Sequence, residues 1–196
     1  MATTLEICNE ALGLIGADPI ASLTEDSNEA RWCNTQFARN KAALLSERAW
    51  SFAEAQLTLE SPTESAWKDG WLYDIPANVL RIYRCYHEVG GTPRKAEWRR
   101  LGDKILAKHE GTVYAIGIMG DTDEAQFPEL FSVALAARLA SEMAVPIARS
   151  RQLQADLATV YQYKLRAAAA SDGSEARSER TDTTQLTWVR GGGYTL

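Results

Sequence analysis

The residues best suited to acid–base or metal chemistry are few in this chain of 196 residues. Its two histidines are His87 and His109, and imidazole is the side chain whose charge changes closest to neutral pH. Cys85 and His87 are two residues apart, a spacing that turns both side chains of a strand to one face and makes a metal or nucleophile pair conceivable. Metal sites normally offer four ligands at recognisable spacings, and no second pair accompanies this one. We therefore favour a half-buried strand with a solvent-facing imidazole.

Carboxylates that could act in pairs occur at Glu25 with Asp26 and within 121–124. Glycan cleavage uses two carboxylates held at a defined separation. The acidic residues of 121–124 precede an expected helix, where negative charge stabilises the positive end of the helix dipole, so we favour a structural role. The glycines at 191–193 have no helix after them that could receive a phosphate. We assign no catalytic, cofactor-binding or metal-binding residue.

Charge is distributed unevenly along the chain. The sequence has 21 Lys and Arg residues against 26 Asp and Glu residues, a net charge of −5. From Arg81 to Glu110 there are eight basic and four acidic residues, so this segment carries +4 and the remainder −9. A net acidic surface disfavours wrapping of nucleic acid by the whole protein. The basic segment either contacts phosphate or an acidic partner surface, or forms solvated strands whose edges lysine and arginine protect.

The overall composition is that of a globular domain. Apolar residues make up 45% and charged residues 24% of the chain, close to the averages for folded proteins, which argues against disorder over the whole length. No stretch approaches the roughly 18 uncharged residues that a membrane-spanning helix needs, and we expect no secretory signal. The three cysteines do not suggest a disulfide framework, so we expect free thiols, with Cys8 and Cys33 buried on helix faces.

Capping signals and apolar spacing predict four helices. A capping box of Thr3 and Glu6 begins the first. The second begins at Asp26, the third at Pro128, and the fourth covers about 148–170 and stops at Asp172-Gly173. The side chains expected to face the core are Leu5, Cys8, Leu12, Ile15, Ala30, Cys33, Phe37, Leu44, Phe131, Leu135, Leu139, Met143, Leu153, Leu157, Val160, Tyr161 and Leu165.

Between the second and third helices, the pattern predicts a small antiparallel β meander inserted at about 71–118, after an extended run that Pro62 closes. The expected strands are 79–88, 94–100, 104–108 and 112–118. Alternation would place on one face of the first strand Val79, Arg81, Tyr83, Cys85 and His87. The predicted fold is mainly α: an antiparallel helix bundle in residues 1–173 with this insertion, followed by an extended, flexible C-terminal arm at 174–196.

The arm begins with a charged and small-residue stretch and ends in apolar and aromatic residues. An isolated monomer offers such a tip no burial, so we expect it to bind a partner. The candidate partner-docking residues are Leu186, Trp188, Arg190 and Tyr194.

Segments spread over about residues 3–170 together resemble one protein family. They are 6–12 with 14–16, 20–27 with Ala30 and Cys33, 44–50 with Phe52 and Ala53, Tyr73 with Pro76 and Leu80-Arg81, and 130–146. In combination they are similar to tail tubular protein A, the head-to-tail adaptor of short-tailed phages. The arm beyond Gly173 matches this family least.

The resemblance implies a structural virion protein that is not an enzyme and uses no cofactor. Twelve copies would form a ring between the portal protein and the tail nozzle protein, continuing the channel through which double-stranded DNA passes. The protein would be assembled in the host cytoplasm, reside at the head-to-tail interface and contact no membrane. Two alternatives stay open: a peptidoglycan-hydrolysing tail protein, since some adaptors of this kind are credited with cell-wall hydrolysis, and a nucleic-acid-binding module built on the basic meander.

Overall fold

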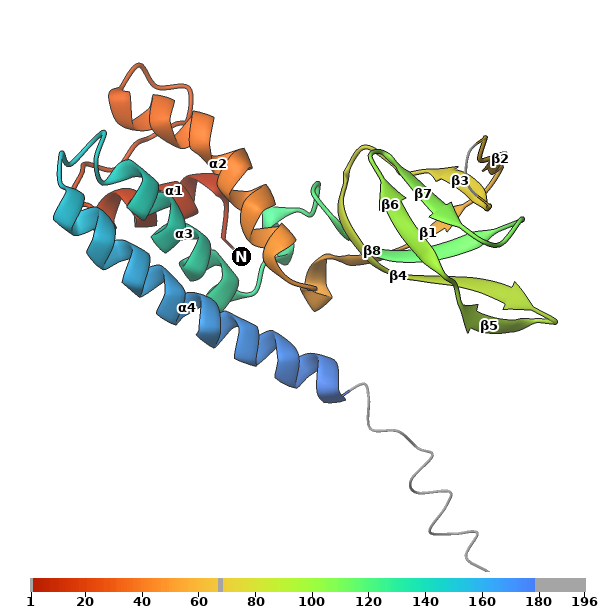
Figure 1. The fold of residues 1–196 in the computed structure, drawn as a ribbon. Helices are drawn as coiled ribbons and strands as arrows, with labels where there is room; N and C mark the ends of the chain where they lie inside the picture. The colour runs from red at the N-terminus through yellow and green to blue at the C-terminus, as the bar shows by residue number, and fades with distance from the viewer. Residues whose placement is uncertain (1, 67–68, 179–196) are drawn as a thin grey trace, which may run out of the picture.

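The computed structural model describes residues 2–66 and 69–178, and within them helices form one part of the molecule and strands the other (Figure 1). The helical part consists of α1 (Thr4–Leu14), α2 (Asn28–Glu47), α3 (Glu129–Met143) and α4 (Arg151–Ser178). The β part consists of β1 (Glu54–Leu59), β2 (Thr63–Glu64), β3 (Trp71–Asp74), β4 (Val79–Val89), β5 (Thr92–Lys95), β6 (Trp98–Leu101), β7 (Lys104–Ala107) and β8 (Val113–Met119). Two short 3-10 helices, η1 (Ser51–Ala53) and η2 (Glu124–Gln126), lie where the chain passes between the two parts.

The prediction of a mainly α fold is wrong. Helices account for 45% and strands for 24%, in two antiparallel sheets, which makes an α+β fold. The inserted β structure begins at Glu54 rather than near residue 71 and ends at Met119. Sequence reasoning underestimated it because the extended run before Pro62 and the aromatic segment 71–74 form strands only by pairing with distant partners, β8 and β7.

Two four-stranded sheets enclose the core of the β part. The first sheet has the strand order β1-β8-β4-β5 and the second β2-β3-β7-β6. The single strand expected at 94–100 is two strands, β5 and β6, one in each sheet, and the buried Ala96 lies between them with its N–H donated to the Cys85 carbonyl (2.9 Å). The side chains buried in this core are Leu59, Tyr73, Val79, Ile82, Cys85, Ala96, Ile105, Ala107, Val113 and Ala115.

Strand β4 departs from simple alternation. Its pairing with β8 shifts register twice, between Val79 and Arg81 and between Ile82 and Arg84. The buried positions are therefore Val79, Ile82 and Cys85, and the predicted placement of Arg81 and Tyr83 on their face is wrong. A bulge inserts a residue and turns the following side chain to the other face. Gly117 of β8 accommodates this backbone, since a Cβ there would lie 2.6 Å from the Arg81 carbonyl oxygen.

The helix starts follow the sequence closely. Thr3 and Glu6 form the predicted capping box, in which the Glu6 N–H donates to Thr3 Oγ1 at 3.2 Å. The cap of α2 is Ser27, one residue after the predicted Asp26, and its hydroxyl accepts from the Ala30 N–H at 3.2 Å. Local capping chemistry thus fixes these boundaries to within one residue.

The end of α4 differs from the prediction. The helix continues through Gly173 to Ser178, so Asp172-Gly173 is not a stop and the first residues of the expected arm, 174–178, are helical. The Asp172 carboxylate is buried and accepts hydrogen bonds from the backbone N–H (2.9 Å) and the hydroxyl (2.7 Å) of Ser51. This contact with η1 holds α4 against the start of the β part, and tertiary structure overrides the low helix propensity of glycine.

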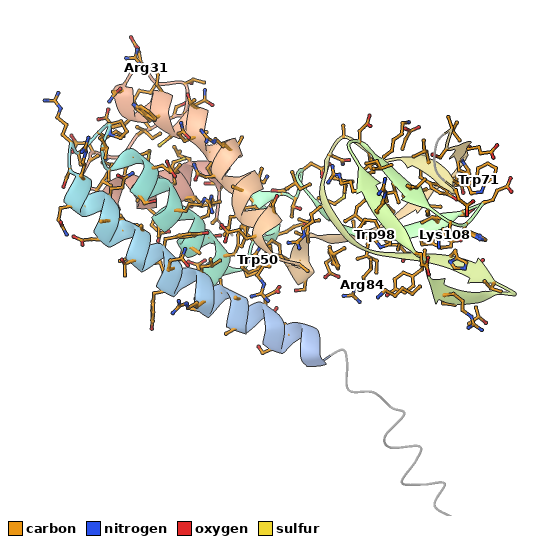
Figure 2. The ribbon with its side chains drawn as sticks, viewed as in Figure 1. Arg31, Trp50, Trp71, Arg84, Trp98 and Lys108 are labelled. Carbon is orange, nitrogen blue, oxygen red and sulfur yellow. The ribbon has the colours of Figure 1, made fainter. Side chains whose placement is uncertain are left out.

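The predicted apolar stripes meet in one core in the helical part. The large side chains expected on α3 are fully buried, as are Cys8 and Cys33, and all three cysteines are free thiols. Val160 is the exception among the expected core residues, because 38% of it is exposed. At the end nearest the β part, the buried Trp50 packs edge-on against Phe131 (ring centroids 5.0 Å apart) and donates its indole N–H to the Leu44 carbonyl (2.9 Å) (Figure 2).

One arginine joins the two parts. Arg81 of β4 donates from Nη1 to the carbonyl oxygens of Ser46 (3.2 Å) and Glu47 (3.4 Å) at the end of α2. These carbonyls have no partner within the helix, and a cation at a helix C-terminus also interacts favourably with the helix dipole. Opposite Arg81 in the sheet lies Ile118, which is buried in the core of the helical part, so the near end of the first sheet is held on the helices.

Candidate functional site

The four residues predicted to dock a partner, Leu186, Trp188, Arg190 and Tyr194, lie outside the described residues. The candidate sites among the described residues are the reactive groups singled out in the sequence, on which the alternatives to a structural protein depend, and the surfaces that the fold creates.

The carboxylates of 121–124 each have a structural partner. Asp121 accepts from the Asn78 side-chain amide (2.8 Å), and Asp123 caps η2 by accepting from the Ala125 N–H (2.9 Å). Glu124 forms an ion pair with Lys41 of α2 (2.7 Å). These contacts support the structural role that the sequence favoured over catalysis.

His87 and His109 lie side by side in the β part, with ring centroids 4.4 Å apart and ring planes inclined by 28°. Both line a shallow pocket of about 340 Å³ together with Lys95 and Lys108. Cys85 is buried in the core, and burial raises the pKa of its thiol to about 12, so it is protonated and a poor nucleophile at neutral pH. Within 2–66 and 69–178, no three His, Cys, Asp or Glu side chains are grouped so that they could hold a metal ion.

A polar network in the helical part links three helices. Arg138 of α3 bonds to the Glu47 carboxylate, to the Tyr161 hydroxyl (2.9 Å) and to Asn40 Oδ1 (3.1 Å), and Tyr161 also donates to Glu47 (2.8 Å). Burial, with the hydrogen bond to Glu47, raises the pKa of Tyr161 to about 12. The polar atoms of these four side chains form hydrogen bonds with one another, so the network holds α2, α3 and α4 together. It does not suggest a reactive group.

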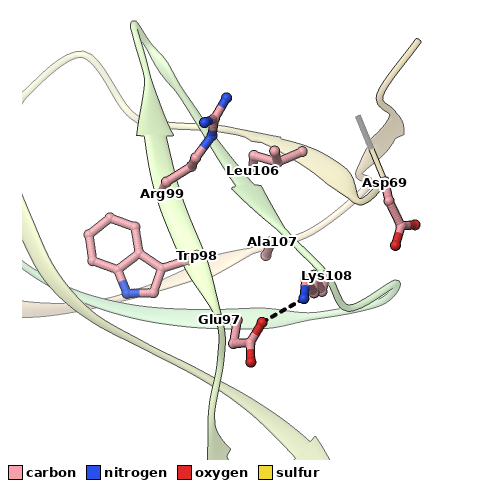
Figure 3. Close-up of a pocket in the computed structure, with 7 residues that line it drawn as sticks. All are labelled: Asp69, Glu97, Trp98, Arg99, Leu106, Ala107 and Lys108. Carbon is pink, nitrogen blue, oxygen red and sulfur yellow. Dashed lines mark ion pairs between the residues drawn. The ribbon is translucent and has the colours of Figure 1, made fainter. Parts of the chain in front are cut away.

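Two carboxylates, Asp69 and Glu97, line the pocket drawn in Figure 3, whose volume is about 260 Å³. The Lys108 ammonium is 2.8 Å from Glu97 Oε2 and lies between the two acidic residues. The hydrogen bond and charge of Lys108 lower the pKa of Glu97, whereas the general acid of a glycosidase needs a raised pKa. Glu97 is therefore unsuited to act as the general acid that the peptidoglycan alternative requires.

Several of the eight basic residues in 81–110 already have partners within the chain. Arg81 bonds to the end of α2, Arg100 to the carbonyls of Leu80 (3.1 Å) and Gly102 (2.9 Å), Lys104 to Asp74, and Lys108 to Glu97. Carboxylates neutralise two of these cations locally, and such pairing reduces the charge that would be available to phosphates. The basic segment is better described as strands with protected edges than as a continuous cationic face.

The outer face of the first sheet carries an open groove that is partly apolar. Tyr86 of β4 and Tyr114 of β8 are directly opposite in the sheet, and Ile116 lies two residues along from Tyr114. These three half-buried side chains, which we call the tyrosine face, line a groove of about 560 Å³. None of the three belongs to either core cluster. The rim of the groove consists of Gln56, Glu88 and Pro93.

Strand β8 explains why this face is uncovered. Val113 and Ala115 point into the core between the sheets, while Tyr114, Ile116 and Ile118 point outward. Of these three outward-pointing side chains, only Ile118 is covered by the helices. Sequence reasoning missed this face, although a strand that is apolar on both sides is a sign that both sides are covered.

A second uncovered apolar surface lies on the helical part. Val160 and Tyr163 of α4 are 38% and 77% exposed. They are three residues apart and therefore neighbours on one side of the helix. Leu130 and Val145, near the two ends of α3, are exposed as well. The side of α4 that bears Val160 and Tyr163 and the tyrosine face belong to different parts of the molecule.

Comparison with known proteins gives no assignment: no family model matches the chain, and no curated protein matches its sequence. None of the helices in the described part of the chain has the length and apolar character needed to cross a membrane.

Proposed function

We propose that this chain is a head-to-tail adaptor subunit of a short-tailed phage, a non-enzymatic virion protein assembled in the host cytoplasm. Twelve copies form a ring between the portal protein and the tail nozzle, and double-stranded DNA passes through the ring. The proposal extends the resemblance of residues 3–170 to tail tubular protein A.

The observation that carries the proposal is the presence of two different uncovered apolar surfaces, the tyrosine face and the side of α4 that bears Val160 and Tyr163. A closed ring is built from a heterologous interface, in which one surface of each subunit meets a different surface of the next. Exposed apolar patches on a folded protein commonly mark such contacts.

Charge and chemistry agree with this role. The net charge of −5 and the internal pairing of the basic segment suit a channel wall along which DNA must move without binding tightly. Asp123 is engaged in capping, Glu124 and Glu97 in ion pairs, and the three thiols are buried. A structural subunit needs none of them to be reactive.

Electron microscopy of the full chain mixed with portal rings of the same phage tests the proposal. We expect a ring of additional density on the portal. Tyr163→Ser should reduce ring occupancy, because it removes the most exposed aromatic side chain on α4, whereas Gln162→Ser, at the adjacent exposed position, should not.

Two results would contradict the proposal. Portal rings that stay bare at high concentrations of folded protein would exclude the adaptor role. A cleared band on a peptidoglycan zymogram, absent with a heat-inactivated sample, would contradict the non-enzymatic part of the proposal.

A further inference from the structure

Strand β1 forms an open edge of the first sheet. It pairs with β8 on one side, and no described residue pairs with its other side. The edge also lacks the usual protection, since the six residues of β1 include no lysine, arginine or proline. Its outward-facing side chains, Gln56 and Thr58, lie opposite Ile116 and Tyr114, so a strand added here would extend the tyrosine face.

The chain itself contains a sequence suited to such an edge. Residues 183–190 read Thr-Thr-Gln-Leu-Thr-Trp-Val-Arg, and Leu186, Trp188 and Arg190 alternate with Gln185, Thr187 and Val189. Threonine, tryptophan and valine are enriched in strands. The segment also shares the tripeptide Gln-Leu-Thr with β1 at 56–58.

We propose that residues 183–190 of a neighbouring copy add to β1 as an antiparallel strand. In one register Arg190 lies opposite Glu54, Trp188 opposite Gln56 and Leu186 opposite Thr58. The three side chains then share the outer face, where Trp188 and Leu186 extend the cover over Ile116 and Tyr114. Main-chain hydrogen bonds supply affinity and the alternate side chains supply specificity, as in other strand additions.

Charge supports this register. Arg190 is the one charged side chain within 183–196. The outer side of β1 begins with Glu54, and Glu60 directly follows the strand. Opposite charges that face each other across two strands attract and stabilise the pairing. A shift by two residues would place Arg190 beside the neutral Gln56 instead.

Chain length indicates that the added strand comes from another copy. The bond of Asp172 to Ser51 fixes α4 near the start of β1, and Figure 1 shows its last turns diverging from the strands. In this register residue 184 lies opposite Glu60, at the far end of β1, about 20 Å from Glu54. The six steps from Ser178 to residue 184 span at most about 22 Å when fully extended. The chain's own segment would have to start beside Glu54 to reach that far, so we assign the added strand to a neighbouring copy.

The inference rests on the proposed function in one respect, because a ring places a neighbour beside each subunit. Disulfide formation between two differently tagged full-length variants tests it. Thr58→Cys in one and Leu186→Cys in the other would place the two thiols directly opposite. The matched control pairs Thr58→Cys with Thr187→Cys, whose side chain would point to the opposite face. The native cysteines are buried.

After mild oxidation of the mixed proteins with portal rings, we expect a mixed disulfide dimer in roughly tenfold greater yield for 58/186 than for 58/187, because opposed Cβ atoms lie within bonding range. Equal yields, or none, would overturn the inference. So would an intrachain disulfide in the Thr58→Cys/Leu186→Cys double variant.

Electron microscopy of the same samples separates the two proposals. Rings without the 58/186 disulfide would overturn the strand addition and leave the adaptor role standing. The disulfide in samples whose portals stay bare would support strand addition between copies and contradict the adaptor role.

Discussion

The helical part and the β part bury their apolar side chains in cores of different size. Among the described residues, the core of the helical part contains 26 buried residues and that of the β part ten. The helical part buries most of its large apolar side chains but leaves exposed Leu130, Val145, Val160 and Tyr163. The first sheet leaves two half-buried tyrosines and an isoleucine in an open groove. The helical part therefore has the larger core, and both parts offer apolar contact surface.

Polar contacts follow the same division. The network of Arg138, Glu47 and Tyr161 lies partly buried among three helices. In the β part the ion pairs of Lys104 with Asp74 and Lys108 with Glu97 are at the surface. Exposed pairs contribute only about 0–1 kcal/mol because water and salt screen them. The β part therefore depends on a small apolar core.

The largest expected effect comes from the aromatic cluster of the helical part. Phe131→Ala should lower the free energy of unfolding by about 3–5 kcal/mol, because it leaves a cavity beside Trp50, Phe52 and Phe127. Urea denaturation, monitored by circular dichroism, measures this loss of unfolding free energy. Leu130→Ala is the matched control, since Leu130 is 42% exposed and its loss should cost far less. Equal losses for the two variants would contradict the described core.

The next effect tests whether the two parts unfold separately. Ile105→Ala removes a fully buried side chain of the smaller core and should cost about 2–4 kcal/mol. Few contacts join the two parts. In this variant we therefore expect the near-ultraviolet circular dichroism of the aromatic side chains to change at a lower urea concentration than the helical circular dichroism at 222 nm. Coincident transitions would show that the two cores unfold as one unit.

A smaller effect concerns alkaline pH. The raised pKa of Tyr161, about 12 in the folded chain against about 10 when unfolded, means that the unfolded state loses this proton first. Stability from this group is complete below pH 10 and is lost as pH rises toward 12, by about 1–2 kcal/mol. Tyr161→Phe should be less stable at pH 8 but lose less stability between pH 10 and 12 than the unchanged chain. Parallel pH profiles of the two proteins would contradict this.

The smallest effect on stability is expected at the tyrosine face. Tyr114→Thr keeps a strand-favouring residue at a position outside both cores, so the free energy of unfolding should change by less than about 1 kcal/mol. The 58/186 disulfide described above should nevertheless decrease, because the added strand loses an apolar contact. A large loss of stability would show that Tyr114 belongs to the core after all.

The helical part could be predicted from sequence to a large extent. The capping residue Thr3 acts on its own helix, and the predicted start at Asp26 lies one residue before the cap of α2, Ser27. The stripe from Phe131 to Met143 follows a period that a short window reveals. Such signals are local. The end of α4 was misjudged because the bond from Ser51 to Asp172 joins residues more than a hundred positions apart.

The β part resisted prediction for the same physical reason. Strand β1 exists because it pairs with β8, about 60 residues later, and no short window contains that information. The bulges of β4 changed which side chains face inward, and so removed Tyr83 from the expected face. The tyrosine face could have been anticipated only by asking why β8 is apolar on both sides. The predicted docking residues at 186–194 lie outside the described chain, and the cross-linking experiment addresses them directly.

The guanidinium of Arg81 bears on how the β part could be moved to another scaffold. It reaches the carbonyl end of α2 from a strand, and with the buried Ile118 and the Ser51–Asp172 contact it holds the first sheet on the helices. A chimera that transplants residues 54–119 onto another helical scaffold would carry Arg81 and Ile118, provided that the recipient helix ends with open carbonyls at the same place. Loss of Arg81 alone would leave both cores and the contacts of Ile118 and Ser51 in place.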